Sequence, residues 1–315
     1  MKRLVSASIV FLFSFLIARG QDVKKEEGDS YQQLVKKYEA MKDSLSKVNP
    51  LLPAVSSVMM NKNQLEINLF NTILSTTSAR NDDGELYNLN SRTTYLFNTL
   101  QLTYGVSKNS RLNLGLDIHL SSARIDNENS SLFKVFSSEV QGNSQFARAI
   151  TSIGPRIRWK PIQDNYRFTI QSSFLFPVLN DAGKENLLGT SQTYFQSQFL
   201  YSFHPAESFF LFSQVGFQYG FKNEDASSKF YPAVTGYGIF YIPRKTVFFA
   251  LINYSPFFMN ETNWEHFANA LQIGGGVQYQ ISKNILINGY YTKYIWGTSY
   301  PAFNSYTIGL RFVTG

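Results

Sequence analysis

The chain has 315 residues, of which 43% are hydrophobic, and it carries a formal net charge of +7 with no cysteine. The lack of cysteine excludes a disulfide framework and a lipid anchor on an N-terminal cysteine. If the basic leader with Lys2, Arg3 and Arg19 is removed, the net charge falls to +4. A residual charge that small argues against nucleic acid as a partner.

The beginning of the chain is typical of a secretory signal peptide. Lys2 and Arg3 precede an apolar run over residues 4–18, and a small-residue cleavage site ends at Gly20. The run is shorter than the roughly 20 residues that a membrane-spanning helix needs. We therefore expect an exported protein from which residues 1–20 are removed.

Residues 21–63 form a separate segment without alternation of apolar and polar residues. Ser30 and Gln33 make a capping box, and apolar residues then recur at helical spacing. This pattern predicts a helix from about Tyr31 to Ser46, followed by an extended linker. The segment is interpreted as a solvated periplasmic helix, as a plug in the lumen of the next domain, or as a handle for a partner or for self-association.

Residues 64–315 alternate between apolar and polar side chains. In the stretch Arg111–Ser121, the residues Leu112, Leu114, Leu116, Ile118 and Leu120 take every second position. A period of two predicts strands with one apolar and one polar face. Twelve such strands are predicted near residues 64–77, 92–106, 111–123, 148–160, 166–177, 190–203, 209–221, 231–242, 247–258, 268–281, 285–296 and 304–314.

The connections between the predicted strands alternate in length. Tight turns (SKNS, PIQDN, HPAES, PRKT and SKN) follow the even strands. Longer polar loops follow the odd strands, near 78–91, 124–147, 178–189, 222–230, 259–267 and 297–303. This asymmetry predicts an all-β fold, a closed antiparallel transmembrane β-barrel of about 12 strands, with the short turns and both ends of the barrel domain in the periplasm.

The loop over residues 124–147 contains Asp126, Glu128 and Glu139. We expect it to be disordered. The alternatives are a constriction folded into the pore and a weak calcium site.

Aromatic residues are abundant, with 28 Phe and 19 Tyr. If the parity of the strands is followed, the outward face carries rings near both membrane interfaces, as the aromatic girdles of outer-membrane barrels do. The set expected at the periplasmic side is Tyr104, Trp159, Tyr166, Phe168, Tyr201, Phe203, Phe209, Tyr279 and Phe312. The set expected at the outer side is Phe217, Tyr219, Tyr254, Tyr294 and Trp296.

These features together resemble the small outer-membrane β-barrels of Gram-negative bacteria and, more loosely, the twelve-stranded porin-like channels. The resemblance covers residues 64–315 and is architectural. The segment from Tyr306 to Phe312 resembles the C-terminal signal that the barrel-insertion machinery reads, although three further residues follow it. The resemblance implies a location in the cell outer membrane, contact with the bilayer and outer-membrane lipids, and small polar solutes as cargo.

The charges of the inward face lie mainly in the periplasmic half of the predicted barrel. Its arginines are Arg111, Arg156, Arg158, Arg167 and Arg311. Glu66 opens the first strand, which must pair with the last, so it can reach Arg311. Arginines without a partner would line the periplasmic mouth and attract anions. Alternatively, they pair with lumen carboxylates or with the N-terminal segment and fill the barrel.

Glutamines add a neutral hydrogen-bonding lining suited to polar solutes. They are Gln101, Gln171, Gln196, Gln198, Gln214, Gln218, Gln272, Gln278 and Gln280.

Asp117, His119 and Ser121 superficially resemble the His-x-Ser of outer-membrane phospholipases. Their parity directs them into the lumen and away from a lipid substrate, and same-face residues two apart on a strand lie about 6 to 7 Å apart. A triad needs its members within hydrogen-bond reach. We therefore expect Asp117 and His119 to line the pore, with no catalytic residue, no cofactor and no metal site.

The sequence thus favours an outer-membrane channel for passive passage of small polar or anionic solutes. The alternative is a barrel that binds a partner for secretion, adhesion or envelope assembly through its N-terminal segment and outer loops. A third possibility is an outer-membrane hydrolase.

Overall fold

The structure, a computed structural model, describes residues 58–162, 167–188, 192–206, 209–224, 226–242, 245–260 and 263–314. The expected signal peptide, the expected helix from Tyr31 to Ser46 and most of the linker after it lie outside these residues. In the described part of the chain, no helix is long and apolar enough to cross a membrane.

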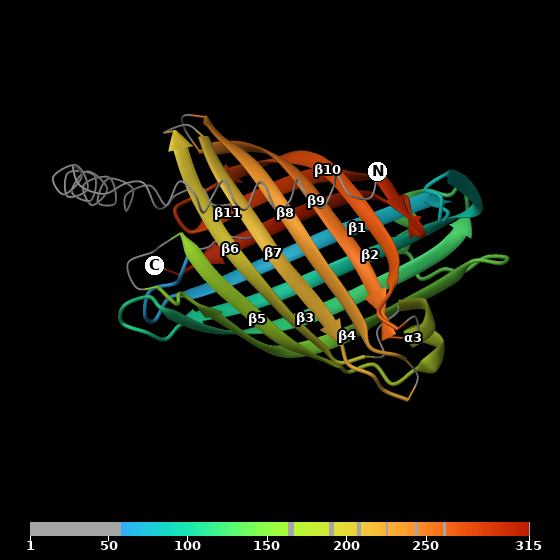
Figure 1. Cartoon of the computed structure of the whole chain (residues 1–315), viewed down its shortest axis with the longest axis horizontal. Helices are drawn as coiled ribbons and strands as arrows, with labels where there is room; N and C mark the ends of the chain where they lie inside the picture. The colour runs from blue at the N-terminus through green and yellow to red at the C-terminus, as the bar shows by residue number, and fades with distance from the viewer. Residues whose placement is uncertain are drawn as a thin grey trace. The chain divides into compact units, whose positions relative to one another are not determined.

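Twelve long antiparallel strands form a closed barrel (Figure 1). Their bounds are β1 Leu65–Arg80, β2 Leu86–Gly105, β3 Leu112–Asn127, β4 Gln145–Trp159, β5 Phe168–Pro177, β6 Tyr194–Ala206, β7 Phe209–Gly220, β8 Lys229–Ile242, β9 Thr246–Met259, β10 His266–Gln280, β11 Ile285–Thr298 and β13 Asn304–Val313. The two-residue strand β12, Tyr300–Pro301, adds to the end of β1. Two short helical elements, η1 (Leu132–Phe136) and α3 (Ala182–Leu188), lie in loops.

The barrel closes because the first strand pairs with the last. β1 is hydrogen-bonded to β2 on one side and to β13 on the other, in a register that runs from Glu66 opposite Val313 to Ser75 opposite Asn304. Closure satisfies the backbone groups that an open sheet would leave at its edges, as hydrocarbon requires. The prediction of a closed antiparallel transmembrane β-barrel with about 12 strands is confirmed.

The alternation in the sequence becomes an inner and an outer surface. Along β3 and β4, the outward side chains of Leu114 and Ile157 are 47% and 43% exposed, whereas their inward neighbours Asn113 and Arg158 are 0% and 3% exposed. Apolar outside and polar inside is the reverse of a water-soluble sheet packed on a core. The outer surface therefore suits the hydrocarbon of a bilayer.

Outward aromatic residues lie near the strand ends, as expected for Tyr104, Trp159 and Trp296, which are 43%, 44% and 51% exposed. Tyr166 lies outside the described residues. The outward assignment of Tyr294 is wrong: this residue pairs with inward Gln272 and its ring stacks on Tyr300. The cause is a β-bulge, because one extra residue in β11 opposite Leu271 and Gln272 reverses the parity of the strand.

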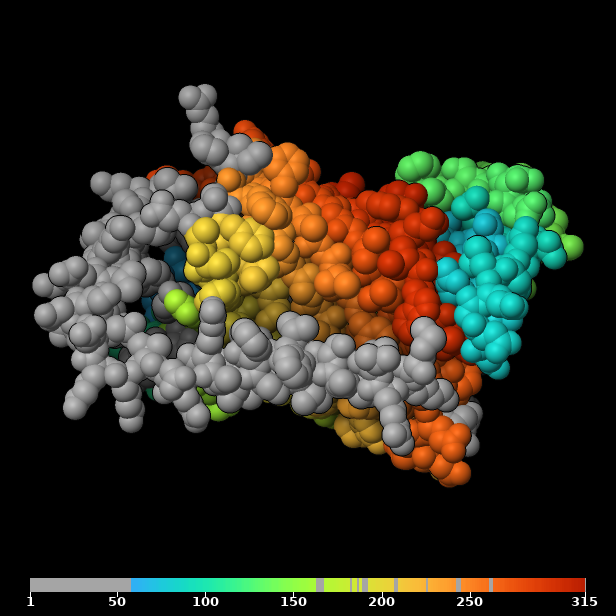
Figure 2. All heavy atoms as spheres, turned by 45° about the horizontal axis from the view of Figure 1, so that its top comes forward, coloured from blue at the N-terminus to red at the C-terminus, as the bar shows by residue number. Residues whose placement is uncertain are grey.

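The two ends of the barrel differ. At the short-turn end, the described connections are tight turns, and the chain ends there beside the start of β1, where Thr314 donates its backbone N–H to Leu65. At the opposite, long-loop end, strands β1 to β4 run further than predicted. The expected loop over residues 78–91 is instead a hairpin with a turn at Asn81–Glu85, and this hairpin and the β3–β4 loop gather at one end (Figure 2).

The β3–β4 loop, residues 128–144, is ordered and lies on the outer wall, which corrects the expectation of disorder. Val135 of η1 is fully buried against Ile73 and Leu96, which both point outward. Arg124 donates to the carbonyls of Ser137 and Glu139. The loop therefore does not form the constriction considered from the sequence.

Candidate functional site: the lumen

A network of buried ion pairs crosses the lumen near the short-turn end. Arg158 of β4 and Arg311 of β13 both contact Glu66 of β1, at 3.2 and 2.6 Å. Arg156 pairs with Asp117 of β3 and donates Nε to its Oδ2 at 3.1 Å. All five side chains are at most 9% exposed. The expected contact between Glu66 and Arg311 is present.

The sequence left two interpretations of the arginines, as free charges at the mouth or as paired charges that fill the barrel. These contacts decide between them for three of the arginines. Arg156, Arg158 and Arg311 have carboxylate partners and are not free charges at a mouth. Three arginines nevertheless face two carboxylates, so the network keeps one excess positive charge. Buried ions need this pairing because the desolvation of an isolated charge is costly.

The two other expected arginines lie at the rim. Arg111 precedes β3, and its Nη2 donates to the backbone carbonyl of Pro161 at 2.9 Å. Arg167 precedes β5 and accepts a backbone hydrogen bond from Ser202. Arg111 thus supports the β4–β5 turn.

The chain just before β1 lies against the inner wall at the same end. We call residues 58–61 the strap. Asn113 clamps the backbone of Met60 with two hydrogen bonds of 3.0 Å, one to its N–H and one to its carbonyl. Arg158 donates to the carbonyl of Val58 at 3.1 Å. A Cβ on Gly105 would lie 1.9 Å from the Asn61 carbonyl, so only glycine fits there.

Release of the strap is expected to expose Met60, which is 3% exposed. Because the chain has no cysteine, Met60→Cys gives a single thiol whose labelling by a water-soluble maleimide can be timed. Asn113→Leu removes two hydrogen bonds at ~1 kcal/mol each, so labelling should accelerate roughly tenfold or more. Asn288→Leu, an inward substitution on β11, is the matched control. Equal labelling rates in both variants would contradict the clamp.

The opposite side of the lumen is apolar in its short-turn half. The buried side chains there are Leu200, Phe210, Phe212, Ile239, Val247, Phe249, Leu251 and Leu286. They come from β6 to β11 and point inward by register. In its short-turn half the lumen is therefore polar along β1 to β5, whereas the inward side chains of β6 to β9 are mainly apolar there.

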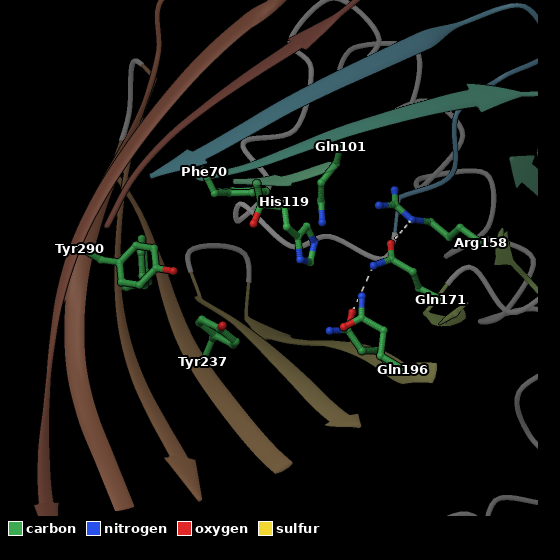
Figure 3. A pocket seen from close by; sticks show the side chains of 11 residues that line it. Phe70, Gln101, His119, Arg158, Gln171, Gln196, Tyr237 and Tyr290 are labelled. Carbon is green, nitrogen blue, oxygen red and sulfur yellow. Dashed lines mark hydrogen bonds between the residues drawn. The ribbon is translucent and has the colours of Figure 1, made fainter. Parts of the chain in front are cut away.

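A cavity of about 270 Å³ lies in the lumen, and we call it the chamber (Figure 3). Its polar wall consists of Gln101, His119, Arg158, Gln171, Gln196 and Gln198, together with Thr99. Its aromatic wall consists of Phe70, Tyr237, Phe249 and Tyr290. In the close view, Tyr237 and Tyr290 lie across the space from His119 and Gln171.

The β5–β6 loop folds into the lumen at the long-loop end. Leu188 of α3 is 5% exposed and packs with Ala123 and Ala147, and Leu179 and Leu187 join the same cluster. Register places Ala123 and Ala147 on the inner face. The loop element that packs against the inner wall is thus α3 and not the β3–β4 loop.

The start of α3 is fixed by Asp181. Its Oδ1 accepts the backbone N–H of Lys184 at 3.2 Å, and its other oxygen pairs with the Lys184 ammonium at 2.8 Å. The hydrogen bond from the Lys184 side chain lowers the pKa of the Asp181 carboxyl. The helix therefore begins where a capping carboxylate is favoured.

The residues expected to line the lumen are placed as follows. Asp117 lies in the ion-pair network and accepts a hydrogen bond from Ser173 at 2.7 Å. His119 and Gln171 line the chamber. Gln272 donates to Thr292. Register puts all nine glutamines on the inner face.

The geometry gives no support for a hydrolase at Asp117, His119 and Ser121. Asp117 is bound by Arg156, and the hydroxyl of Ser121 is hydrogen-bonded to Thr151 at 3.3 Å. A nucleophile has to be hydrogen-bonded to its base, and the base to its orienting acid. Among the described residues, no group of three or more His, Asp or Glu side chains lies close enough to hold a metal ion.

Sequence reasoning missed the aromatic wall of the chamber and the inward path of α3. Tyr237, Phe249 and Tyr290 each stand at an inward position of an alternating strand, so parity could have identified them. No comparable signal marks α3 or the strap, because neither has a period that fixes its neighbours.

No protein-family model matches the sequence, and no curated protein matches it. Solved structures do resemble it in fold. An outer-membrane channel from Pseudomonas putida F1 is 9% identical with a TM-score of 0.61, over 82% of this chain and 98% of that one. The beta domain of the Bordetella autotransporter BrkA is 10% identical with a TM-score of 0.52, over 81% of this chain and 100% of that one. At these identities the likeness establishes the barrel fold alone.

Proposed function

We propose that the chain forms a channel in the outer membrane through which small polar or anionic solutes pass passively. The observation that carries this proposal is the polar lining of the lumen, which combines nine inward glutamines with the excess positive charge of the ion-pair network. The similarity in fold to an outer-membrane channel is consistent with this proposal.

In the proposed orientation, the short-turn end faces the periplasm and the long-loop end faces the outside. Short turns on the periplasmic side are the rule for outer-membrane barrels. The strap then lies at the periplasmic mouth and α3 at the external mouth. The N-terminus of the chain, after removal of the signal peptide, would then be periplasmic.

The proposal is tested by recording from purified, folded protein in a planar bilayer. We expect discrete current steps, and reversal potentials in a salt gradient that indicate a preference for anions, because fixed positive charge in a narrow aqueous path attracts them. Arg311→Gln should move the reversal potential toward zero, since it removes the excess charge while Arg158 still pairs with Glu66.

Arg311→Lys keeps the charge and is the matched control. Folding of each variant is verified by the change in its mobility on an SDS gel after boiling. Folded protein without current steps would refute the channel. An unaltered reversal potential in Arg311→Gln would refute a selectivity role for the ion-pair network.

A further inference from the structure

The aromatic wall of the chamber is a continuous surface. The ring of Phe249 lies between those of Tyr237 and Tyr290, with centroid distances of 6.3 and 5.8 Å and interplanar angles of 56° and 64°. Edge-to-face and tilted arrangements of this kind leave ring faces and edges available to a further flat apolar group. The three rings come from β8, β9 and β11, which are rigid elements of the barrel.

The opposite wall is a chain of hydrogen bonds with a fixed direction (Figure 3). Arg158 donates Nε to Gln171 Oε1 at 2.9 Å, and Gln171 donates Nε2 to Gln198 Oε1 at 3.2 Å. A guanidinium can only donate, so each amide accepts on the side of Arg158 and donates on the other. The next donor in the series is the amide group of Gln198, which lines the chamber. Its natural complement is an acceptor, and a charged acceptor is bound most strongly.

Size and charge narrow the class of ligand. The volume of about 270 Å³ holds roughly nine water molecules at about 30 Å³ each, which suits one small ring. The excess positive charge of the adjoining ion-pair network favours an anion.

We propose that the chamber is a binding site for a single-ring aromatic carboxylate, with its ring on Tyr237, Phe249 and Tyr290 and its carboxylate toward Gln198 and Arg158. This proposal rests on the proposed channel, because the ligand is taken to be a solute in passage. It goes beyond that proposal by naming a substrate class that needs both a charge and a flat apolar face.

Inhibition of the ion current tests the proposal directly. Benzoate is added to a bilayer that contains the open channel, and its half-blocking concentration is compared with those of acetate, benzyl alcohol and glucuronate. Acetate carries the charge without the ring, benzyl alcohol carries the ring without the charge, and glucuronate carries the charge on a polar ring. We expect benzoate to block at a concentration about tenfold lower than any of them, as aromatic contacts in addition to a charged hydrogen bond imply.

Two variants test the aromatic wall and the polar wall of the chamber separately. Tyr290→Leu should raise the half-blocking concentration of benzoate severalfold and leave that of acetate unaltered. Gln198→Leu should raise that of benzoate about tenfold, the effect of losing one hydrogen bond to a charged group, without affecting benzyl alcohol. Tyr279→Leu, an outward tyrosine that is 46% exposed, is the matched control and should behave like the parent chain.

The outcomes distinguish the two proposals. Folded protein without current steps would overturn the channel itself. Current steps with equal block by benzoate and benzyl alcohol, or by benzoate and glucuronate, would leave the channel intact and overturn the aromatic-carboxylate site. Benzoate selectivity that persists in Tyr290→Leu and in Gln198→Leu would also overturn it, because the binding would then lie elsewhere.

Discussion

Glu66→Gln is expected to lower the stability of the folded barrel by about 3 to 5 kcal/mol, the usual cost of removing one partner from a buried ion pair. Glu66 is 2% exposed and is the carboxylate that Arg158 and Arg311 share. The neutral amide would leave two guanidiniums facing each other without a counter-charge. The measurement is the urea midpoint of unfolding in detergent or lipid, together with the temperature at which the folded band on an SDS gel disappears.

A second substitution tests the cause of this loss. Addition of Arg311→Met to Glu66→Gln removes one of the two orphaned charges, so the double variant should be more stable than Glu66→Gln alone. Asp83→Asn, at an exposed position of the β1–β2 turn, removes a carboxylate without burial and should shift the midpoint little. A large loss in Asp83→Asn, or additive losses in the double variant, would show that the shared carboxylate is not the source.

Replacement of residues 179–188 by a short Gly-Ser linker is expected to raise the single-channel conductance severalfold. The reason is that α3 occupies the lumen at the long-loop end, where Leu188 packs with Ala123 and Ala147. A milder change, Leu188→Asp, introduces a charge into this apolar cluster. Because the burial of an unpaired charge is costly, the helix should leave the lumen and the conductance should rise. The readout is the size of the current steps at fixed salt.

The control for the expulsion of α3 is Val140→Asp in the β3–β4 loop. Val140 is 50% exposed and belongs to a loop that lies on the outer wall. Its substitution should leave the step size as it is. If Leu188→Asp also left it unaltered while the barrel remained folded, α3 would not limit the current.

The barrel was predictable because each strand repeats the same simple pattern. Alternation with a period of two marks a strand, indicates its two faces and sets its approximate ends. The same parity brings Glu66 to Arg311 and places the nine glutamines inward. It failed at Tyr294, where an extra residue in β11 opposite Leu271 and Gln272 reverses the faces. A bulge leaves no mark in the hydrophobic pattern, so only the paired strand reveals it.

The loops were less predictable because their positions depend on contacts far away in the sequence. Val135 is buried by Ile73 and Leu96, and Leu188 by Ala123 and Ala147. A polar composition is shared by disordered loops and by loops that pack through one or two apolar residues. The charges of residues 124–147 therefore suggested disorder, whereas Val135, Arg124 and Arg148 hold this loop on the wall.

The ion pair between Glu66 and Arg311 joins residues that are 245 positions apart, and this separation bears on assembly. β13 is the last strand of the barrel, so the two charges meet only when the sheet closes. Until then an inserting sheet carries the Arg311 guanidinium without its carboxylate, as well as two bare edges, in a medium that solvates neither. Partly closed intermediates are therefore destabilised both by an unpaired charge and by unpaired backbone groups. The pairing of β1 with β13 removes both at once, so neutralisation of the interior is coupled to closure of the barrel.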